Sequence, residues 1–255
     1  MQVSTNHYKE ARQDIIDGLE DRTEQMDRLL KAFSSGAIEA DALMGELRIL
    51  AHSVKSASSM SEMNALKAVA HRFEDYLADV KEPSDAVLGS IQIFVDRLSH
   101  AVEGFTKGET EDVSALMRSL PAKGVFDVAD ITVTDTEIML VMEPGIATKI
   151  VTRELLECGY RMVNVAGTMD ALMLIPSMRP DLVIVSRVMP ELDGVDLACA
   201  ISAMPTTKEI PVALLTAEAL DSRTLRNLPK DVPIMRKGGN FAGDVADVLV
   251  KVGLL

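Results

Sequence analysis

The segment AHSVKSASSM contains the first residues of this chain whose types and spacing suggest chemistry. His52 is followed by Lys55 and Ser56 at three and four positions, so all three lie on one face of a helix. An exposed imidazole is a nucleophile toward phosphoryl groups, and a cation one turn away would stabilise phosphate charge. On these residues alone, a solvent-exposed histidine without chemistry is the simpler interpretation.

A second pair of residues with similar spacing follows in the next helical segment. His71 and Glu74 are three positions apart, and a neighbouring helix of a bundle could bring them beside His52. A carboxylate that accepts a hydrogen bond from an imidazole fixes its tautomer and raises the basicity of its other nitrogen. Without such a contact, the two residues would be an ordinary surface pair.

These residues closely resemble the histidine phosphotransfer (Hpt) domain, in particular the N-terminal Hpt domain of chemotaxis histidine kinases. That family carries His-Ser-Ile/Leu-Lys-Gly-x-Ala on its second helix, and this chain reads HSVKSAS from His52 onward. The family's second histidine and its glutamate come 19 and 22 positions after the first histidine, where this chain has His71 and Glu74. The resemblance covers about residues 5–120.

The resemblance implies a phosphorelay role for these four residues. His52 would be phosphorylated, Lys55 would support the phosphate, and His71 and Glu74 would tune the imidazole. No glycine-rich phosphate loop of the Walker type occurs in the chain. A separate histidine kinase would therefore supply the phosphate and a separate response-regulator receiver would remove it, so we expect a phosphotransfer protein without a kinase domain of its own.

Two departures from the family pattern lie close to His52. Ser56 stands where the family usually has glycine, and Ser61-Glu62 stands where it often has an apolar residue and glycine. Either change could weaken the docking of a partner protein.

The segment PDLVIVSRVMPELDG at residues 180–194 resembles the third strand and following loop of response-regulator receiver domains. In that family an aspartate ends the strand and Met-Pro-x-x-Asp-Gly follows; here MPELDG matches, but Ser186 stands at the aspartate position. Thr216, 30 residues later, and Lys237 fit the family's markers at the ends of the fourth and fifth strands. The resemblance covers residues 137–255 and implies the flavodoxin-like strand order 2-1-3-4-5.

Most acidic residues of a receiver site are missing from this chain. An aspartyl-phosphate receiver needs one carboxylate to accept phosphate and two more acids to hold Mg²⁺. The family has two consecutive acids after its first strand. An alignment counted back from Gly159 places Met142 and Glu143 at these positions, and one counted back from Ser186 places Val141 and Met142 there. At most one acid therefore remains, and serine is a poor nucleophile without a base.

We therefore predict a pseudoreceiver, in which the fold is kept and phosphorylation is lost. Mg²⁺ binding at this site is not expected, and no zinc or haem signature predicts another metal or cofactor. Thr216 and Lys237 would then have structural or partner-facing roles. The contrary hypothesis, phosphorylation of Ser186 itself by a different mechanism, is disfavoured.

Two different patterns of apolar residues divide the chain near residue 121. Before it, apolar residues recur at helical spacing and predict an up-and-down helical bundle. After residue 136, short apolar runs alternate with helical stretches and predict a doubly wound α/β domain with a parallel five-stranded sheet. We expect helices at about residues 5–33, 40–60, 63–80, 83–102, 111–120, 146–157, 168–178, 194–203, 219–228 and 241–252, and strands at 138–142, 161–165, 182–185, 211–215 and 232–235.

These patterns predict two domains joined by a short connection. The helical bundle would occupy residues 1–122, the linker 123–136, and the receiver-like domain 137–255. The sequence is linker-like at its start, but residues such as Phe126 and Ile131 are too apolar for a free tether. We therefore expect part of the linker to pack.

Composition narrows the class of protein. The 255 residues include 26 Lys and Arg against 39 Asp and Glu, a net charge of −13 that argues against a nucleic-acid binder. No apolar run approaches the ~18 residues needed for membrane insertion, and the N-terminus lacks the features of a signal peptide. Cys158 and Cys199 are too few for a disulfide framework, so a cytoplasmic protein is expected.

The leading hypothesis is a two-component phosphorelay protein that accepts and passes phosphate through His52. Its non-phosphorylatable receiver would act as a protein-interaction or regulatory module. An alternative is a non-catalytic scaffold or inhibitor of a signalling histidine kinase with both domains degenerate, which Ser56, Met142 and Ser186 motivate. A third, weaker hypothesis is a receiver that reads a signal other than phosphate.

Overall fold

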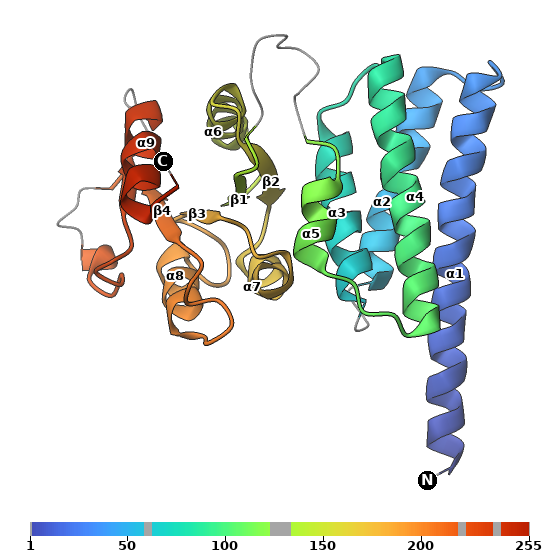
Figure 1. The fold of residues 1–255 in the computed structure, drawn as a ribbon, viewed down its shortest axis with the longest axis horizontal. Helices are drawn as coiled ribbons and strands as arrows, with labels where there is room; N and C mark the ends of the chain where they lie inside the picture. The colour runs from blue at the N-terminus through green and yellow to red at the C-terminus, as the bar shows by residue number, and fades with distance from the viewer. Residues whose placement is uncertain (1, 59–62, 123–133, 219–222, 237–240, 255) are drawn as a thin grey trace. The chain divides into compact units, whose positions relative to one another are not determined.

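The chain folds into two compact units, Met1–Pro121 and Ala122–Leu255 (Figure 1). The computed structural model describes residues 2–58, 63–122, 134–218, 223–236 and 241–254. Most of the predicted linker therefore lies outside the described residues, and the domain limits stay a prediction. Residues 134–136 do pair with the second unit, because the Thr134 amide donates to the Gly159 carbonyl at 2.8 Å and the Arg161 amide donates to the Thr136 carbonyl at 3.0 Å.

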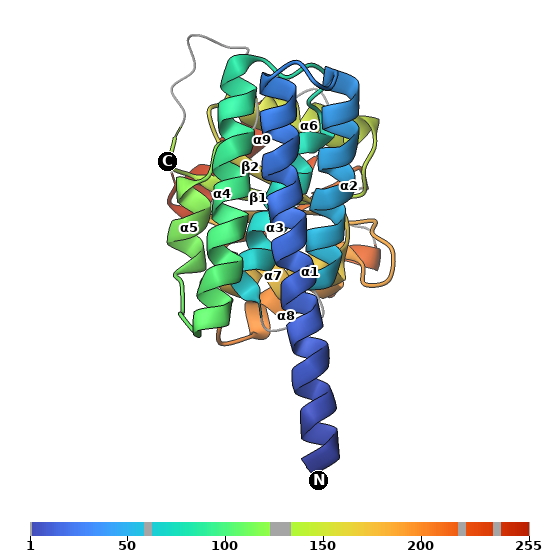
Figure 2. The same ribbon diagram turned by 90° about the vertical axis from the view of Figure 1, so that its right-hand side faces the viewer.

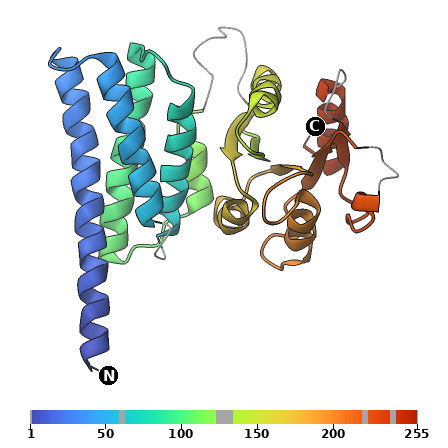
Figure 3. The same ribbon diagram turned by 180° about the vertical axis from the view of Figure 1, so that it is seen from behind.

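The N-terminal unit is the predicted helical bundle. It consists of α1 (Gln2–Ser34), α2 (Ala40–Ser58), α3 (Asn64–Ala78), α4 (Asp85–Lys107) and the short α5 (Val113–Ser119). Helix α1 lies between α2 and α4 in Figure 2, and Figure 3 shows α2 beside α3. Ser84 caps the start of α4, since its hydroxyl oxygen accepts from the Val87 amide at 3.4 Å. Gly108 ends that helix with φ of 72°, a left-handed conformation that suits glycine.

Aliphatic and aromatic side chains fill the centre of this bundle. Phe73 of α3 stacks on Phe94 of α4 with ring centroids 5.1 Å apart, and Tyr76 approaches Phe94 at the same distance. These contacts fix α3, which carries Glu74, against α4. Other large side chains that are almost fully buried include Ile16, Leu19, Met26, Leu43, Met44, Leu47, Leu66, Leu77, Ile91 and Leu98.

The C-terminal unit is a parallel sheet with helices on both faces. Its strands are β1 (Glu137–Val141), β2 (Arg161–Val165), β3 (Leu182–Ser186), β4 (Val212–Thr216) and β5 (Ile234–Arg236). They are ordered β2-β1-β3-β4-β5, which is the flavodoxin-like order that the sequence predicted. The helices are α6 (Ile146–Glu157), α7 (Thr168–Met178), α8 (Gly194–Ala203) and α9 (Phe241–Val252).

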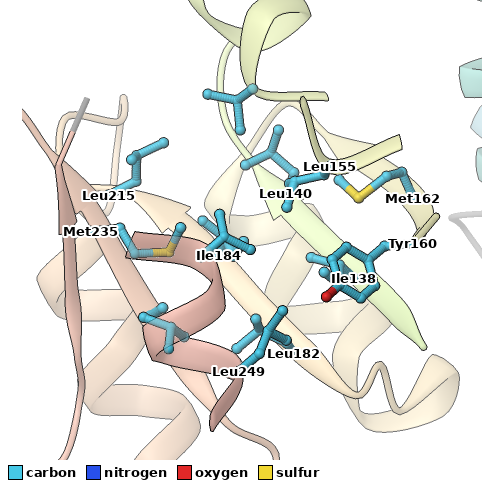
Figure 4. Close-up of a cluster of buried hydrophobic side chains, with 14 of the residues drawn as sticks. Ile138, Leu140, Leu155, Tyr160, Met162, Leu182, Ile184, Leu215, Met235 and Leu249 are labelled. Atoms are coloured by element: carbon cyan, nitrogen blue, oxygen red, sulfur yellow. The ribbon is translucent and has the colours of Figure 1, made fainter. Parts of the chain in front are cut away.

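A single apolar cluster joins one face of the sheet to α6 and α9 (Figure 4). Leu140, Ile184 and Leu215 project from three successive strands of the sheet into it, and Leu155 of α6 and Leu249 of α9 cover them. Helices α7 and α8 pack on the opposite face, against β2, β3 and β4 (Figure 1). With both faces covered, the strands read as continuous apolar runs rather than alternating patterns.

The Asp193-Gly194 pair shapes the loop after β3. The Asp193 carboxylate accepts from the amides of Val195 and Asp196 at 2.9 and 3.0 Å and so caps α8. A Cβ atom at Gly194 would lie 2.3 Å from the carbonyl oxygen of Ser186, so only glycine fits this close approach. The pair therefore holds the start of α8 against the end of β3.

The prediction of a helix at 219–228 is wrong for its described part. Residues 219–222 lie outside the described residues, and Arg223–Leu225 form only a short 3-10 helix, η1. Leu225 is its one buried side chain, so the segment lacks the apolar stripe that a longer helix would need.

No described helix is both long enough and apolar enough to cross a membrane.

Replacing Phe94 should destabilise the helical unit strongly. Phe94 is fully buried and contacts Phe73 and Tyr76, so Phe94→Ala leaves a cavity and should cost about 3–5 kcal/mol in unfolding free energy. Urea unfolding followed by helical circular dichroism measures this. Ile93→Ala is the matched control, because Ile93 is 44% exposed and should change stability by less than about 1 kcal/mol. Equal midpoints for the two variants would contradict the assignment of Phe94 to the core.

Candidate functional site

One face of α2 is held against α3 by a series of polar contacts. Arg48 begins it: its Nε donates to the Leu77 carbonyl at 3.2 Å, and a second guanidinium nitrogen donates to the Val80 carbonyl. A guanidinium at these carbonyls satisfies acceptors at the C-terminal end of α3 and interacts favourably with its dipole. Arg48 lies four residues before His52, so this contact also sets the register between His52 and α3.

His52, Lys55 and Glu74 meet one turn further along the same interface. The Nδ1 atom of His52 lies 2.8 Å from Oε1 of Glu74, and Nζ of Lys55 lies 2.5 Å from Oε2 of the same carboxylate. The His52 side chain is 68% exposed, whereas those of Lys55 and Glu74 are 24% and 30% exposed. The imidazole is thus open to an incoming molecule while its partners form a half-buried support.

The Glu74 carboxylate is kept ionised by this arrangement. Burial alone would raise the pKa of Glu74, but hydrogen bonds from Lys55 and His52, together with their positive charge, hold the pKa below its ordinary value. A carboxylate is therefore present at neutral pH as a hydrogen-bond acceptor for both neighbours.

This geometry defines which imidazole nitrogen is available for chemistry. The Nδ1–H group of His52 donates to Glu74, so the neutral ring keeps its lone pair on Nε2. The carboxylate stabilises the positive charge that develops on the ring when this nitrogen attacks an electrophile. An exposed Nε2 of this kind is suited to accept a phosphoryl group.

Of the residues predicted around His52, Glu74 contacts both His52 and Lys55. His71 is buried on α3, with 5% of its surface exposed, and its role beside His52 stays a prediction. Ser56 is exposed on α2, in keeping with its place on the outer face. Ser61-Glu62 lies outside the described residues.

Two arginines near His52 were not anticipated from the sequence. Arg48 could have been found from its spacing, because it lies one turn before His52 on the same face of α2. Arg22 of α1, whose Nε donates to the Ser53 hydroxyl oxygen at 2.7 Å, carries no such signal because it comes from another helix.

The ends of β1 and β3 hold the residues predicted at the degenerate receiver site. Val141 pairs with Val185, so Met142 and Ser186 come next to each other at the ends of the two strands. Met142 is buried in the apolar cluster of the sheet, and Ser186 is 2% exposed with its hydroxyl donating to the Val188 carbonyl at 3.3 Å. The Glu143 side chain is exposed.

An ion pair joins the loops that follow β3 and β4 at this edge. Nε of Arg187 lies 3.0 Å from Oε1 of Glu218, and the side chains are 16% and 32% exposed. The Glu218 amide donates to the buried Thr216 hydroxyl at 3.0 Å, and the Glu218 carboxylate accepts from the Thr224 hydroxyl. Sequence reasoning missed Arg187 and Glu218, and Lys237 lies outside the described residues.

In the part of the chain that the structure describes, no group of three or more His, Cys, Asp or Glu side chains is arranged to hold a metal ion.

Comparison with known proteins assigns the helical unit to a family. Residues 10–105 match the family model of the Hpt domain, and this part of the chain is an Hpt domain. No curated protein matches the sequence of the chain.

Solved receiver structures are similar to part of the chain. The receiver domain of a sensor histidine kinase from Pseudomonas aeruginosa PAO1, crystallised with magnesium in its active-site cleft, is 24% identical over 46% of this chain and 98% of that chain, with a TM-score of 0.42. A histidine kinase receiver domain from Syntrophus aciditrophicus is 26% identical over 46% and 90%, with a TM-score of 0.42. Chemotaxis response regulator CheY4 of Vibrio cholerae is 22% identical over 48% and 99%, with a TM-score of 0.40. The fold assignment of the C-terminal unit rests on its own strand order.

Acidification should release the Glu74 carboxylate from its partners. Because folding lowers the pKa of Glu74, its interactions stabilise the protein above the ordinary glutamate value of about 4.3 and are lost as the pH falls through the lowered value. Wild type should therefore lose more stability on acidification below that value than Glu74→Gln, as measured by urea midpoints of the helical unit. Glu103→Gln serves as control, because Glu103 is 60% exposed and pairs with Lys107 at the surface. An identical pH dependence of wild type and Glu74→Gln would refute this coupling.

Proposed function

We propose that the protein carries a phosphoryl group on His52 and passes it on within a two-component phosphorelay. The single observation that carries this proposal is the exposed imidazole of His52, whose Nδ1 contacts the same carboxylate that binds Lys55. The assignment of residues 10–105 to the Hpt domain supports it independently.

The reaction would begin with an attack by Nε2 of His52 on the phosphorus atom of a phosphorylated donor. The new nitrogen–phosphorus bond forms as the bond from phosphorus to the donor's leaving group breaks. The ring becomes an imidazolium that keeps its Nδ1 proton, and the Glu74 carboxylate stabilises this positive charge. In the reverse sense, a carboxylate of an acceptor protein attacks phosphorus and Nε2 leaves with its electron pair.

Lys55 would neutralise the charge of the phosphoryl group. Its ammonium group is bound to Glu74 before transfer, and its side chain is about a quarter exposed, at 24%. A lysine side chain is long enough to reach from this carboxylate to a phosphoryl group on the imidazole one turn away on α2. The partners implied are a separate histidine kinase as donor and a separate receiver protein as acceptor.

We propose that the C-terminal unit is a receiver-like module that does not itself take up phosphate. Ser186 and Met142 offer no carboxylate at the ends of the two central strands, so neither an aspartyl phosphate nor the usual oxygen ligands of Mg²⁺ would be available. The Arg187–Glu218 ion pair would hold the loops after β3 and β4 together without phosphate. Such a unit would serve as a protein-interaction or regulatory module.

Removing the His52 imidazole should abolish labelling. With catalytic cores of two-component histidine kinases and radiolabelled ATP, we expect acid-labile, alkali-stable label on wild type and none on His52→Gln. His100→Gln is the matched control, because His100 is also exposed but lies on α4. Label that persists in His52→Gln would exclude His52 as the phosphoacceptor, and a wild type that no donor labels would favour the non-catalytic scaffold instead.

Restoring one carboxylate should not restore a receiver. In a His52→Gln background, Ser186→Asp supplies the phosphoacceptor group, but Met142 still provides no ligand for Mg²⁺. After incubation with acetyl phosphate and Mg²⁺, mass spectrometry should show no stoichiometric phosphoryl adduct on His52→Gln with or without Ser186→Asp. A phosphoserine at Ser186 in the single variant would instead support the disfavoured hypothesis of serine phosphorylation.

A further inference from the structure

A second cation lies beside the phosphoacceptor, on the side of α2 that faces α1. Nε of Arg22 donates to the hydroxyl oxygen of Ser53 at 2.7 Å, and Ser53 directly follows His52. Another guanidinium nitrogen of Arg22 donates to the Gly18 carbonyl one turn earlier on α1. The guanidinium is therefore held at Ser53 on the α1 side of α2, whereas Glu74 contacts His52 and Lys55 from the α3 side.

A glycine inside α1 makes room for this arginine. A Cβ atom at position 18 would lie 2.7 Å from Nη1 of Arg22, so an alanine there would make the end of the Arg22 side chain shift from its observed position. Glycine in a helix interior is unfavourable relative to alanine. Gly18 lies well inside α1, and the position of the Arg22 side chain against it gives a physical reason for a glycine there.

The charge of Arg22 is not compensated within the described part of the chain. Its hydrogen-bond partners there are the neutral oxygens of Ser53 and Gly18, and no described carboxylate forms an ion pair with it. A half-buried arginine whose described hydrogen-bond partners are neutral oxygens keeps its positive charge available to an anion.

We propose that Arg22 binds the phosphoryl group that is transferred to and from His52. Its contact with Ser53 is then a resting position, and the guanidinium turns toward the phosphoryl oxygens when the group arrives. Arg22 and Lys55 would hold the phosphoryl group from the α1 side and the α3 side of the imidazole. This inference rests on the proposed function of His52. It adds a residue of α1, which the sequence spacing of residues around His52 could not have indicated.

The test uses a small phosphoryl donor, so that no partner protein contributes. Nε2 of His52 attacks the phosphorus of phosphoramidate, the donor's phosphorus–nitrogen bond breaks and ammonia leaves, while the Nδ1 proton stays on the imidazolium beside Glu74. The rate of formation and the half-life of phosphohistidine are measured by mass spectrometry on the full chain. His52→Gln identifies the label as that of His52.

Three variants of α1 separate the role of Arg22 from a structural one. Arg22→Ala should slow phosphohistidine formation about five- to tenfold, and added salt should reduce this difference. Gly18→Ala should also slow it, although alanine is the better helix former, because its Cβ displaces the guanidinium. Arg28→Ala is the matched control, since Arg28 is exposed on α1, pairs with Glu24 and should have no effect.

The outcomes distinguish this proposal from the one on which it rests. If wild type and Arg22→Ala form phosphohistidine equally well with phosphoramidate, Arg22 does not bind the phosphoryl group. An effect seen only with a phosphorylated protein donor would also overturn the proposal, because Arg22 would then contact the donor protein. Absence of label on wild type with phosphoramidate and with protein donors would overturn the proposed function of His52 itself, and this proposal with it.

Discussion

The shared carboxylate of Glu74 is the interaction on which the geometry of the helical unit's site depends. It binds Nδ1 of His52 with one oxygen and Nζ of Lys55 with the other. The first contact decides which imidazole nitrogen keeps its lone pair, and the second keeps a cation within a turn of the ring. Both contacts require a fixed position of α3 along the axis of α2. Arg48 sets this position by binding the carbonyls at the end of α3, and the packing of Phe73 in the core supports it.

The two units treat the polar groups at their candidate sites differently. The helical unit leaves the His52 imidazole 68% exposed and supports it with half-buried charges, an arrangement that suits a group that must meet other proteins. The α/β unit instead buries Ser186 and Met142 and joins its loops by the ion pair of Arg187 and Glu218.

Much of the fold was predictable because periodicity reports burial. Helical spacing of apolar residues predicted α1 to α5, and apolar runs separated by helices predicted the parallel sheet and its strand order through the receiver resemblance. The exception is η1, where a polar segment with one buried leucine resembled a helix in sequence. There the apolar pattern was too short to decide between a helix and a turn.

The sequence by itself determined the pairs that share one helix, because the rise and twist of a helix convert spacing into position: His52 with Lys55, and His71 with Glu74. Only the tertiary structure showed that Glu74 contacts His52, because this contact depends on the register of α2 and α3. It also decided the contacts of Arg22 with Ser53 and of Arg187 with Glu218. These residues lie on different elements, and packing alone brings such residues together.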